Sequence, residues 1–237
     1  MTTDPARLAG YLQAVDETGT AAGRPDYSFA PNYNVAPTTP VATVVGEDGT
    51  RRIRTMVWGY EPPWQRKGRK PLINARAETL TTSPAFRSAA AHRRCLVPMD
   101  GYYEWRPSAD PLAGKGKTPY YFFRPDGEPL LVAGVWAATG FTIVTTAAVG
   151  GFAEVHDRMP LVVGRPDWDR WLDPARPAPA DLLAAEPAVA GLAMREVSTL
   201  VNRVANNGPE LIEAVTTCGL SSTQPTLLDP ANERAQS

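Results

Sequence analysis

Short apolar stretches rich in β-branched residues, each bounded by a turn, make up most of the chain. This pattern is typical of β-strands rather than of long amphipathic helices. Two turns are well marked, at Glu47-Asp48-Gly49 and at Arg124-Pro125-Asp126-Gly127, because Asp, Pro and Gly favour a reversal of the chain. The predicted strands are residues 40–45, 53–58, 94–97, 102–105, 120–123, 130–136, 141–145 and 196–201.

The helices that the pattern predicts are short. Asp4-Pro5 is a typical helix start, because an Asp side chain caps free amide groups and Pro suits the first helical position. This helix is expected to end between Leu12 and Val15. Further short helices are predicted at residues 83–91, 166–172, 179–186 and 209–215.

No internal repeat and no linker divides the chain into two cores. We therefore predict one compact α+β domain of residues 1–215, with a curved, mostly antiparallel sheet or an open β-barrel and peripheral short helices. Residues 107–118 are rich in Gly, Pro and Lys, which predicts a mobile loop. The polar composition after Thr216 predicts a disordered tail over residues 216–237.

Composition excludes several classes of protein. Because the chain has neither a run of about 18 apolar residues nor a signal peptide, we predict no membrane span and no membrane partner. The two cysteines, Cys95 and Cys218, indicate a reducing, cytoplasmic setting rather than a disulfide framework. His92 and His156 are far apart and have no cysteine neighbours, so we predict no metal and no other cofactor.

The net charge of −1 hides a basic sector. Between Arg51 and Arg94 there are eleven Lys or Arg residues and two acids, Glu61 and Glu78, which gives a local charge of +9. A concentrated basic sector on a nearly neutral protein is typical of phosphate binding. The alternative is a solvated face, with residues 65–70 as an exposed loop.

The candidate for proton transfer is Glu104, which follows an apolar run and stands beside Tyr102, Tyr103 and Trp105. A carboxylate flanked by aromatic surface tends to have a raised pKa, so it could exchange a proton near neutral pH. On its own, such a strand end is more often a structural corner. His156 begins a His-Asp-Arg-Met-Pro segment, and an imidazole also titrates near neutral pH.

Several ordered blocks together resemble the SRAP family (SOS response-associated peptidases, or abasic-site processing proteins). The likeness runs from about Leu8 to about Val215. Its blocks are residues 33–38 (YNVAPT), 58–60 (WGY), 73–79 (INARAET), 93–105 (RRCLVPMDGYYEW), 141–148 (FTIVTTAA), 155–161 (VHDRMPL) and 197–202 (VSTLVN).

The resemblance implies a DNA-damage response protein that recognises abasic sites in single-stranded DNA. In the family, an N-terminal cysteine reacts with the aldehyde of the open sugar and closes a thiazolidine, a covalent DNA–protein link. Glu104 aligns with the family's catalytic glutamate, and His156 is expected to assist ring opening and protonation at the sugar. We expect the protein to act as a monomer, in the cytoplasm and at the nucleoid.

Family members begin Met-Cys-Gly-Arg, whereas this chain begins Met1-Thr2-Thr3-Asp4. In the family the first helix follows the cysteine-bearing strand, so about six residues are missing by comparison, a span of roughly 20 Å in an extended strand. Two explanations are open: Met1 is an internal methionine taken as the start, or the chain is a natural member without the cysteine. Cys95 and Cys218 are not convincing replacements, because one lies in an apolar run and the other lacks a motif.

The resemblance also implies a DNA-binding set. Asn74 and Arg76 are two residues apart, so on a strand they would share a face and grip a phosphate beside the lesion, unless Arg76 pairs with Glu78. Trp64 is expected to stack on an unpaired base, whereas Trp58 is expected in the core. The remaining members of the predicted DNA-binding set are Asn34, Thr145 and Arg158.

Three functions are therefore compared. The first is covalent capture of abasic sites through a cysteine encoded upstream of Met1. The second is a binding module that recognises single-stranded DNA without the covalent step. The third, a thiol peptidase acting on other proteins, is the least favoured, because the sequence shows no Ser/His/Asp or Cys/His arrangement.

Overall fold

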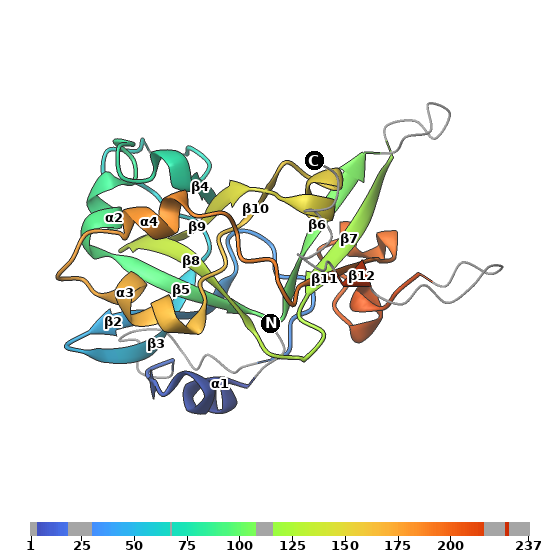
Figure 1. The fold of residues 1–237 in the computed structure, drawn as a ribbon, viewed down its shortest axis with the longest axis horizontal. Helices are drawn as coiled ribbons and strands as arrows, with labels where there is room; N and C mark the ends of the chain where they lie inside the picture. Colours follow the sequence, from blue (N-terminus) through green and yellow to red (C-terminus); the bar gives the residue numbers. More distant parts are fainter. Residues whose placement is uncertain (1–3, 19–29, 67, 108–115, 216–225, 228–237) are drawn as a thin grey trace, which may run out of the picture.

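Two β-sheets, with short helices around them, form the fold of the computed structural model (Figure 1), which describes residues 4–18, 30–66, 68–107, 116–215 and 226–227. The large sheet has the strand order β1-β3-β2-β5-β8-β9-β10, with β4 paired to β9. Its strands are β1 (Val15–Asp16), β2 (Pro40–Glu47), β3 (Thr50–Val57), β4 (Asn74–Arg76), β5 (Arg94–Met99), β8 (Leu130–Ala137), β9 (Gly140–Ala147) and β10 (Arg158–Pro160).

The small sheet has the order β12-β11-β7-β6, so β6 is an edge strand. Its members are β6 (Gly101–Pro107), β7 (Lys117–Phe123), β11 (Ala193–Glu196) and β12 (Thr226–Leu227). Across both sheets the pairing is antiparallel except for β1 with β3 and β4 with β9. Within the described residues neither sheet closes on itself, and the predicted α+β class with mostly antiparallel pairing is confirmed.

The helices are α1 (Pro5–Leu12), α2 (Arg87–His92), α3 (Trp168–Leu172) and α4 (Ala180–Ala184), with short 3₁₀ turns η1 (Ala77–Thr79), η3 (Gly150–Glu154), η4 (Arg165–Asp167), η5 (Thr199–Asn202) and η6 (Pro209–Ile212). The predicted start of α1 is confirmed, because Asp4 Oδ1 accepts a hydrogen bond of 2.8 Å from the Ala6 amide. Among the described residues, no helix is both long and apolar enough to cross a bilayer.

Alternation along the strands divides the apolar residues of the large sheet between two faces. In β5, Leu96 belongs to the cluster that α1, α2 and α3 cover, whereas Cys95 and Val97 belong to a second cluster. That second cluster includes Tyr120 and Phe122 of β7, so the small sheet packs on this face. Side chains on this face of the large sheet therefore lie opposite side chains of β6 and β7.

The chain crosses from the large sheet to the small sheet between β5 and β6. A Cβ on Gly101 would come within 2.3 Å of the Phe122 carbonyl oxygen, so only glycine allows β6 to pair this closely with β7 at its first residue. The Asp48-Gly49 turn between β2 and β3, in which both residues have positive φ, is also as predicted.

Four sequence predictions need correction. The expected strand at 196–201 is wrong, because β11 ends at Glu196 and the Ser198 hydroxyl accepts from the Leu200 amide at the start of η5. The helix expected from residue 83 begins at Arg87. Of the loop expected at 107–118, Pro107 ends β6 and Lys117 and Thr118 begin β7, while residues 108–115 lie outside the described residues.

The fourth correction concerns the tail. Residues 226–227, expected to be disordered, form β12 against β11. Residues 216–225 and 228–237 lie outside the described residues, and the domain boundary at residue 215 stays a prediction.

Candidate functional site

A cavity of about 750 Å³ lies between the facing surfaces of the two sheets. It brings together residues that are far apart in the sequence and that come from β4, β6, β9 and the segment between β9 and β10. The predicted site residues that line it are Asn34, Asn74, Arg76, Glu104, Thr145, His156 and Arg158.

The large sheet contributes Asn74, Arg76 and Thr145. Ala75 is buried in the helix-covered core, so its neighbours Asn74 and Arg76 face the opposite way, toward the small sheet. The parallel register of β4 with β9 places Arg76 directly beside Thr145. The predicted common face of Asn74 and Arg76 is therefore present.

The small sheet contributes Glu104. It lies two residues after Tyr102 on β6, and the Tyr102 ring stacks on Phe122 with a centroid distance of 4.8 Å, so Glu104 also faces the large sheet. Burial raises the pKa of Glu104 above the ordinary carboxyl value, while the neighbouring His156 opposes this rise. A carboxyl with a raised pKa beside an imidazole is suited to donating and accepting protons.

His156 follows η3 and has its Nδ1 atom fixed by the backbone. The Arg158 amide nitrogen lies 3.0 Å from Nδ1, and the Arg158 carbonyl oxygen lies 3.2 Å from the same atom. Asp157 Oδ1 lies 3.2 Å from the same nitrogen and would stabilise the protonated ring. Glu104 and His156 both also line a smaller adjoining cavity of about 510 Å³.

The guanidinium of Arg158 is bound by other residues of the protein. Its guanidinium forms a two-pronged ion pair with Glu78, at 2.6 and 2.9 Å, and donates to the Thr145 carbonyl oxygen at 2.6 Å. This pairing holds the pKa of Glu78 below its ordinary value. No hydrogen bond or ion pair joins Arg76 to Glu78 or to any other described residue, although the charge of Arg76 also helps to lower the pKa of Glu78.

Asn34 lines the cavity but has its amide donors engaged. Its Nδ2 donates to the carbonyl oxygens of Val201, Arg203 and Asn206, at 3.0, 3.1 and 3.3 Å. This side chain braces the loop that follows η5. A direct contact of Asn34 with DNA stays a prediction.

The two tryptophans near the basic loop differ. Trp64 is 65% exposed and is not among the residues that line either cavity. Its predicted stacking on a base stays a prediction. Trp58, expected in the core, packs against the inter-sheet cluster and also lines the cavity, with its indole N–H bonded to the Ile73 carbonyl oxygen at 2.9 Å.

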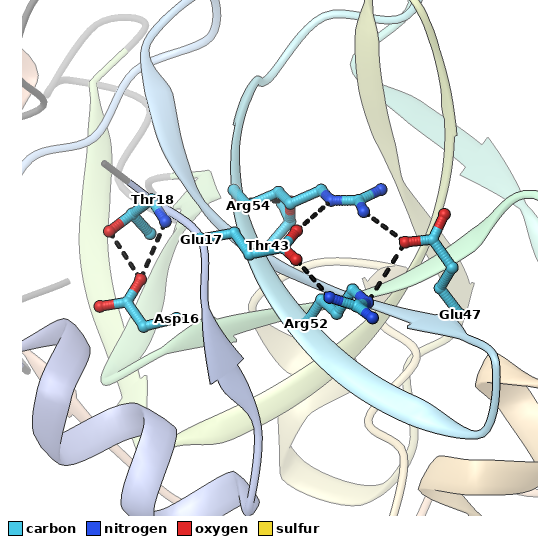
Figure 2. A network of polar contacts seen from close by, with 7 residues as sticks. All are labelled: Asp16, Glu17, Thr18, Thr43, Glu47, Arg52 and Arg54. Carbon is cyan, nitrogen blue, oxygen red and sulfur yellow. Dashed lines mark hydrogen bonds and ion pairs between the residues drawn. The ribbon is translucent and has the colours of Figure 1, made fainter. Parts of the chain in front are cut away.

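Several arginines of the basic sector do not form a free cationic surface. Figure 2 shows Arg52 and Arg54 on β3 between the carboxylates of Glu17 and Glu47. The four ion pairs have N–O distances of 2.5 to 3.3 Å. Arg51 likewise pairs with Asp169 at 2.8 Å, and the buried Arg94 donates to backbone carbonyl oxygens. Fewer cationic side chains are therefore available to bind phosphate than the local charge of +9 suggests.

Three residues around Glu104 make hydrogen bonds that the sequence did not predict. The Tyr103 hydroxyl donates to the Tyr33 carbonyl oxygen, and the Trp105 indole N–H donates to Asn202 Oδ1, both at 2.8 Å. Tyr103, Trp105 and Asn202 all line the cavity. The spacing of two between the aromatic residues was a signal that they share one face of β6.

The thiol within the described residues lies elsewhere. Cys95 is fully buried in β5, and burial raises the pKa of its thiol. No described residue that lines either cavity is a cysteine. Cys218 lies outside the described residues.

Comparison with known proteins decides the family. Residues 1–204 match the family described as SOS response associated peptidase (SRAP). The chain belongs to the SRAP family. Among relatives of this SRAP protein, the abasic site processing protein YoqW of Bacillus subtilis is 34% identical over 208 residues, which cover 80% of this chain and 89% of YoqW.

A second relative is the abasic site processing protein YedK of Escherichia coli. It is 36% identical over 197 residues, which cover 77% of the SRAP chain and 84% of YedK. The crystal structure of a phage-related protein from Bordetella bronchiseptica is similar with a TM-score of 0.64 and 28% identity, over 83% of this chain and 91% of that one. The SRAP family expected from the sequence is thus confirmed.

Proposed function

We propose that this protein recognises abasic sites in single-stranded DNA, and that it captures them covalently when a cysteine stands at its N-terminus. The observation that carries the proposal is the inter-sheet cavity, which gathers an acid–base pair, Glu104 and His156, opposite a guanidinium, Arg76. The relatives YoqW and YedK are abasic site processing proteins, which supports the same substrate.

The chemistry assigned to the pair is proton transfer. To open the sugar ring, the hydroxyl on C1′ loses a proton and the ring oxygen gains one, which gives the aldehyde. His156 is the proposed donor to the ring oxygen, and the carboxylate form of Glu104 is the proposed acceptor.

The covalent step needs an N-terminal α-amine and a thiol. The amine adds to the aldehyde and water leaves, which forms an imine, and the thiol sulfur then adds to the imine carbon while its proton passes to the nitrogen. The product is a five-membered thiazolidine. Protonated Glu104 is the proposed acid that releases water, because its raised pKa keeps the proton available.

The second candidate function is binding without covalent capture. It is favoured by one observation, the absence of a thiol from the part of the cavity lining that the structure describes. Binding and capture share the cavity and differ only in the nucleophile.

Incubation with an abasic single-stranded oligonucleotide separates the two. We expect the 237-residue chain to bind this DNA more tightly than an undamaged oligonucleotide but to give no heat-stable adduct on a denaturing gel. A version preceded by residues that begin Met-Cys-Gly-Arg is expected to give the adduct after removal of the initiator methionine. Equal affinity for damaged and undamaged DNA, with no adduct from either protein, would contradict the proposed function.

Arg76→Ala tests the phosphate grip. We expect weaker binding of abasic single-stranded DNA and a decrease of about 1 in the slope of log affinity against log salt, because one phosphate contact is lost. Arg87→Ala is the matched control, since Arg87 is exposed on α2 and lines neither cavity. A salt slope that is unchanged in Arg76→Ala would exclude a phosphate contact at this position.

A further inference from the structure

Asn202 lies where the two cavities meet, because it lines both of them together with Glu104, Trp105 and His156. The smaller cavity is completed by Gly116 and Lys117 at the start of β7. The Trp105 indole N–H donates to Asn202 Oδ1 over 2.8 Å. An indole nitrogen can only donate, so the oxygen branch of the Asn202 amide must face Trp105, and the NH₂ branch is left for another acceptor.

The loop that carries Asn202 is held in place before any ligand binds. Asn34 Nδ2 donates to the carbonyl oxygens of Val201 and Arg203, the residues on either side of Asn202. Asn206 Nδ2 donates to the Leu200 carbonyl oxygen at 2.8 Å. A donor fixed in this way loses little conformational freedom when it binds. Asn34 is therefore a positioning residue for Asn202.

Lys117 supplies a positive charge to the same small cavity. It is exposed, and no ion pair joins it to another described residue. Glu104 lines the same cavity, so the two side chains share one recess. An amide N–H and an ammonium group that line one small cavity with the acid–base pair are suited to an anionic phosphate oxygen.

We propose that Asn202 and Lys117 form a second phosphate subsite, which binds the DNA backbone on the side of the lesion opposite to Arg76. This proposal rests on the proposed function. Glu104 and His156 line both cavities, so the abasic sugar lies at their junction, with one flanking phosphate on the Arg76 and Thr145 side and the other on the Asn202 and Lys117 side.

A useful variant removes the NH₂ donor of Asn202 and keeps the fold. Asn202→Asp keeps an oxygen that accepts from Trp105 but replaces the NH₂ group with a second acceptor. We expect at least about a tenfold loss of affinity, the typical contribution of a hydrogen bond to a charged group. Thr199→Asp adds the same charge in the same turn, outside both cavities, and is the matched control. Lys117→Ala tests the second donor.

Three single-stranded probes test the geometry, each with one tetrahydrofuran abasic analogue that cannot react covalently. The analogue is internal in the first probe, at the 5′ end without a phosphate in the second, and at the 3′ end without a phosphate in the third. Asn202→Asp and Lys117→Ala are expected to weaken binding of the internal probe and of one terminal probe, and to leave the other terminal probe unaffected. Arg76→Ala is expected to weaken binding of the internal probe and of the terminal probe that the Asn202 and Lys117 variants leave unaffected.

Two results would overturn the subsite. One is that the Asn202→Asp and Thr199→Asp variants bind the internal probe with equal affinity. The other is a loss of the same size on all three probes, which would show that Asn202 does not read a flanking phosphate. If the unsubstituted protein does not prefer the internal probe over undamaged DNA, the proposed function itself fails. The thermal midpoint of each variant shows whether the fold is kept.

Discussion

Arg94→Met is expected to lower the free energy of unfolding by about 3–5 kcal/mol, because buried and partly buried carbonyl oxygens lose their donor, at about 1–3 kcal/mol for each buried one. Arg94 is 3% exposed at the start of β5, and its guanidinium also lies 5.9 Å from the centroid of the Trp171 ring. The carbonyl oxygens that accept from it belong to Ala90, Ala91, Trp171, Asp173 and Arg176.

These acceptors belong to the end of α2 and to the segments around the end of α3, so one side chain joins two helices to the large sheet. A loss of this size should lower the thermal midpoint by roughly 10 °C for a domain of this length. Arg93→Met is the matched control, since Arg93 is half-buried and makes longer bonds, of 3.2 and 3.3 Å, to Trp136 and Ser88. Midpoints that fall equally in both variants would show that the carbonyl contacts of Arg94 are not important for stability.

Much of the fold could be predicted because its signals are local. Alternation of apolar residues marked the strands, and short-range chemistry marked their ends, as at Asp4-Pro5 and Asp48-Gly49. The error at 196–201 has a local cause that apolar alternation does not reveal. Val197 and Val201 suit a strand, but the Ser198 hydroxyl bonds the Leu200 amide and starts a 3₁₀ turn instead.

The division into two sheets depends on pairing between distant segments, which alternation alone does not specify. A strand pattern shows which residues share a face, but not which strand they pack against.

The sequence also does not show which charged residues pair with one another. Arg52 and Arg54 looked available for phosphate, yet they pair with Glu17, which is 35 and 37 residues away.

The sequence predicted the residues at the centre of the candidate site but not the contact between Trp105 and Asn202 at its edge. Glu104, His156, Asn74 and Arg76 belong to blocks that resemble the family, and all four line one cavity. Their catalytic and binding roles stay predictions. The bond between Trp105 and Asn202 joins residues 97 positions apart, so it requires the fold to be known.

Glu104→Gln is expected to lower the rate of covalent capture by about 10²–10⁴-fold, the usual contribution of a general acid–base group. The measurement uses the protein that carries the N-terminal cysteine and follows adduct formation on abasic single-stranded DNA by denaturing gel. Reversal of the adduct should slow as well, because the same proton transfers occur in the opposite direction. Glu186→Gln, at an exposed position outside both cavities, is the control.

The same substitution should raise stability at neutral pH, which separates a chemical role from a structural one. Because burial raises the pKa of Glu104, the folded protein holds this proton more tightly than the unfolded chain. The free energy of unfolding of the unsubstituted protein therefore falls as pH rises from the unfolded-state pKa through the folded-state pKa. Glutamine removes this dependence, so the midpoint of Glu104→Gln should be the higher one at pH 7 and the difference should vanish below about pH 4. A slower variant that is also less stable at pH 7 would indicate that Glu104 is a structural corner rather than the proton-transfer group.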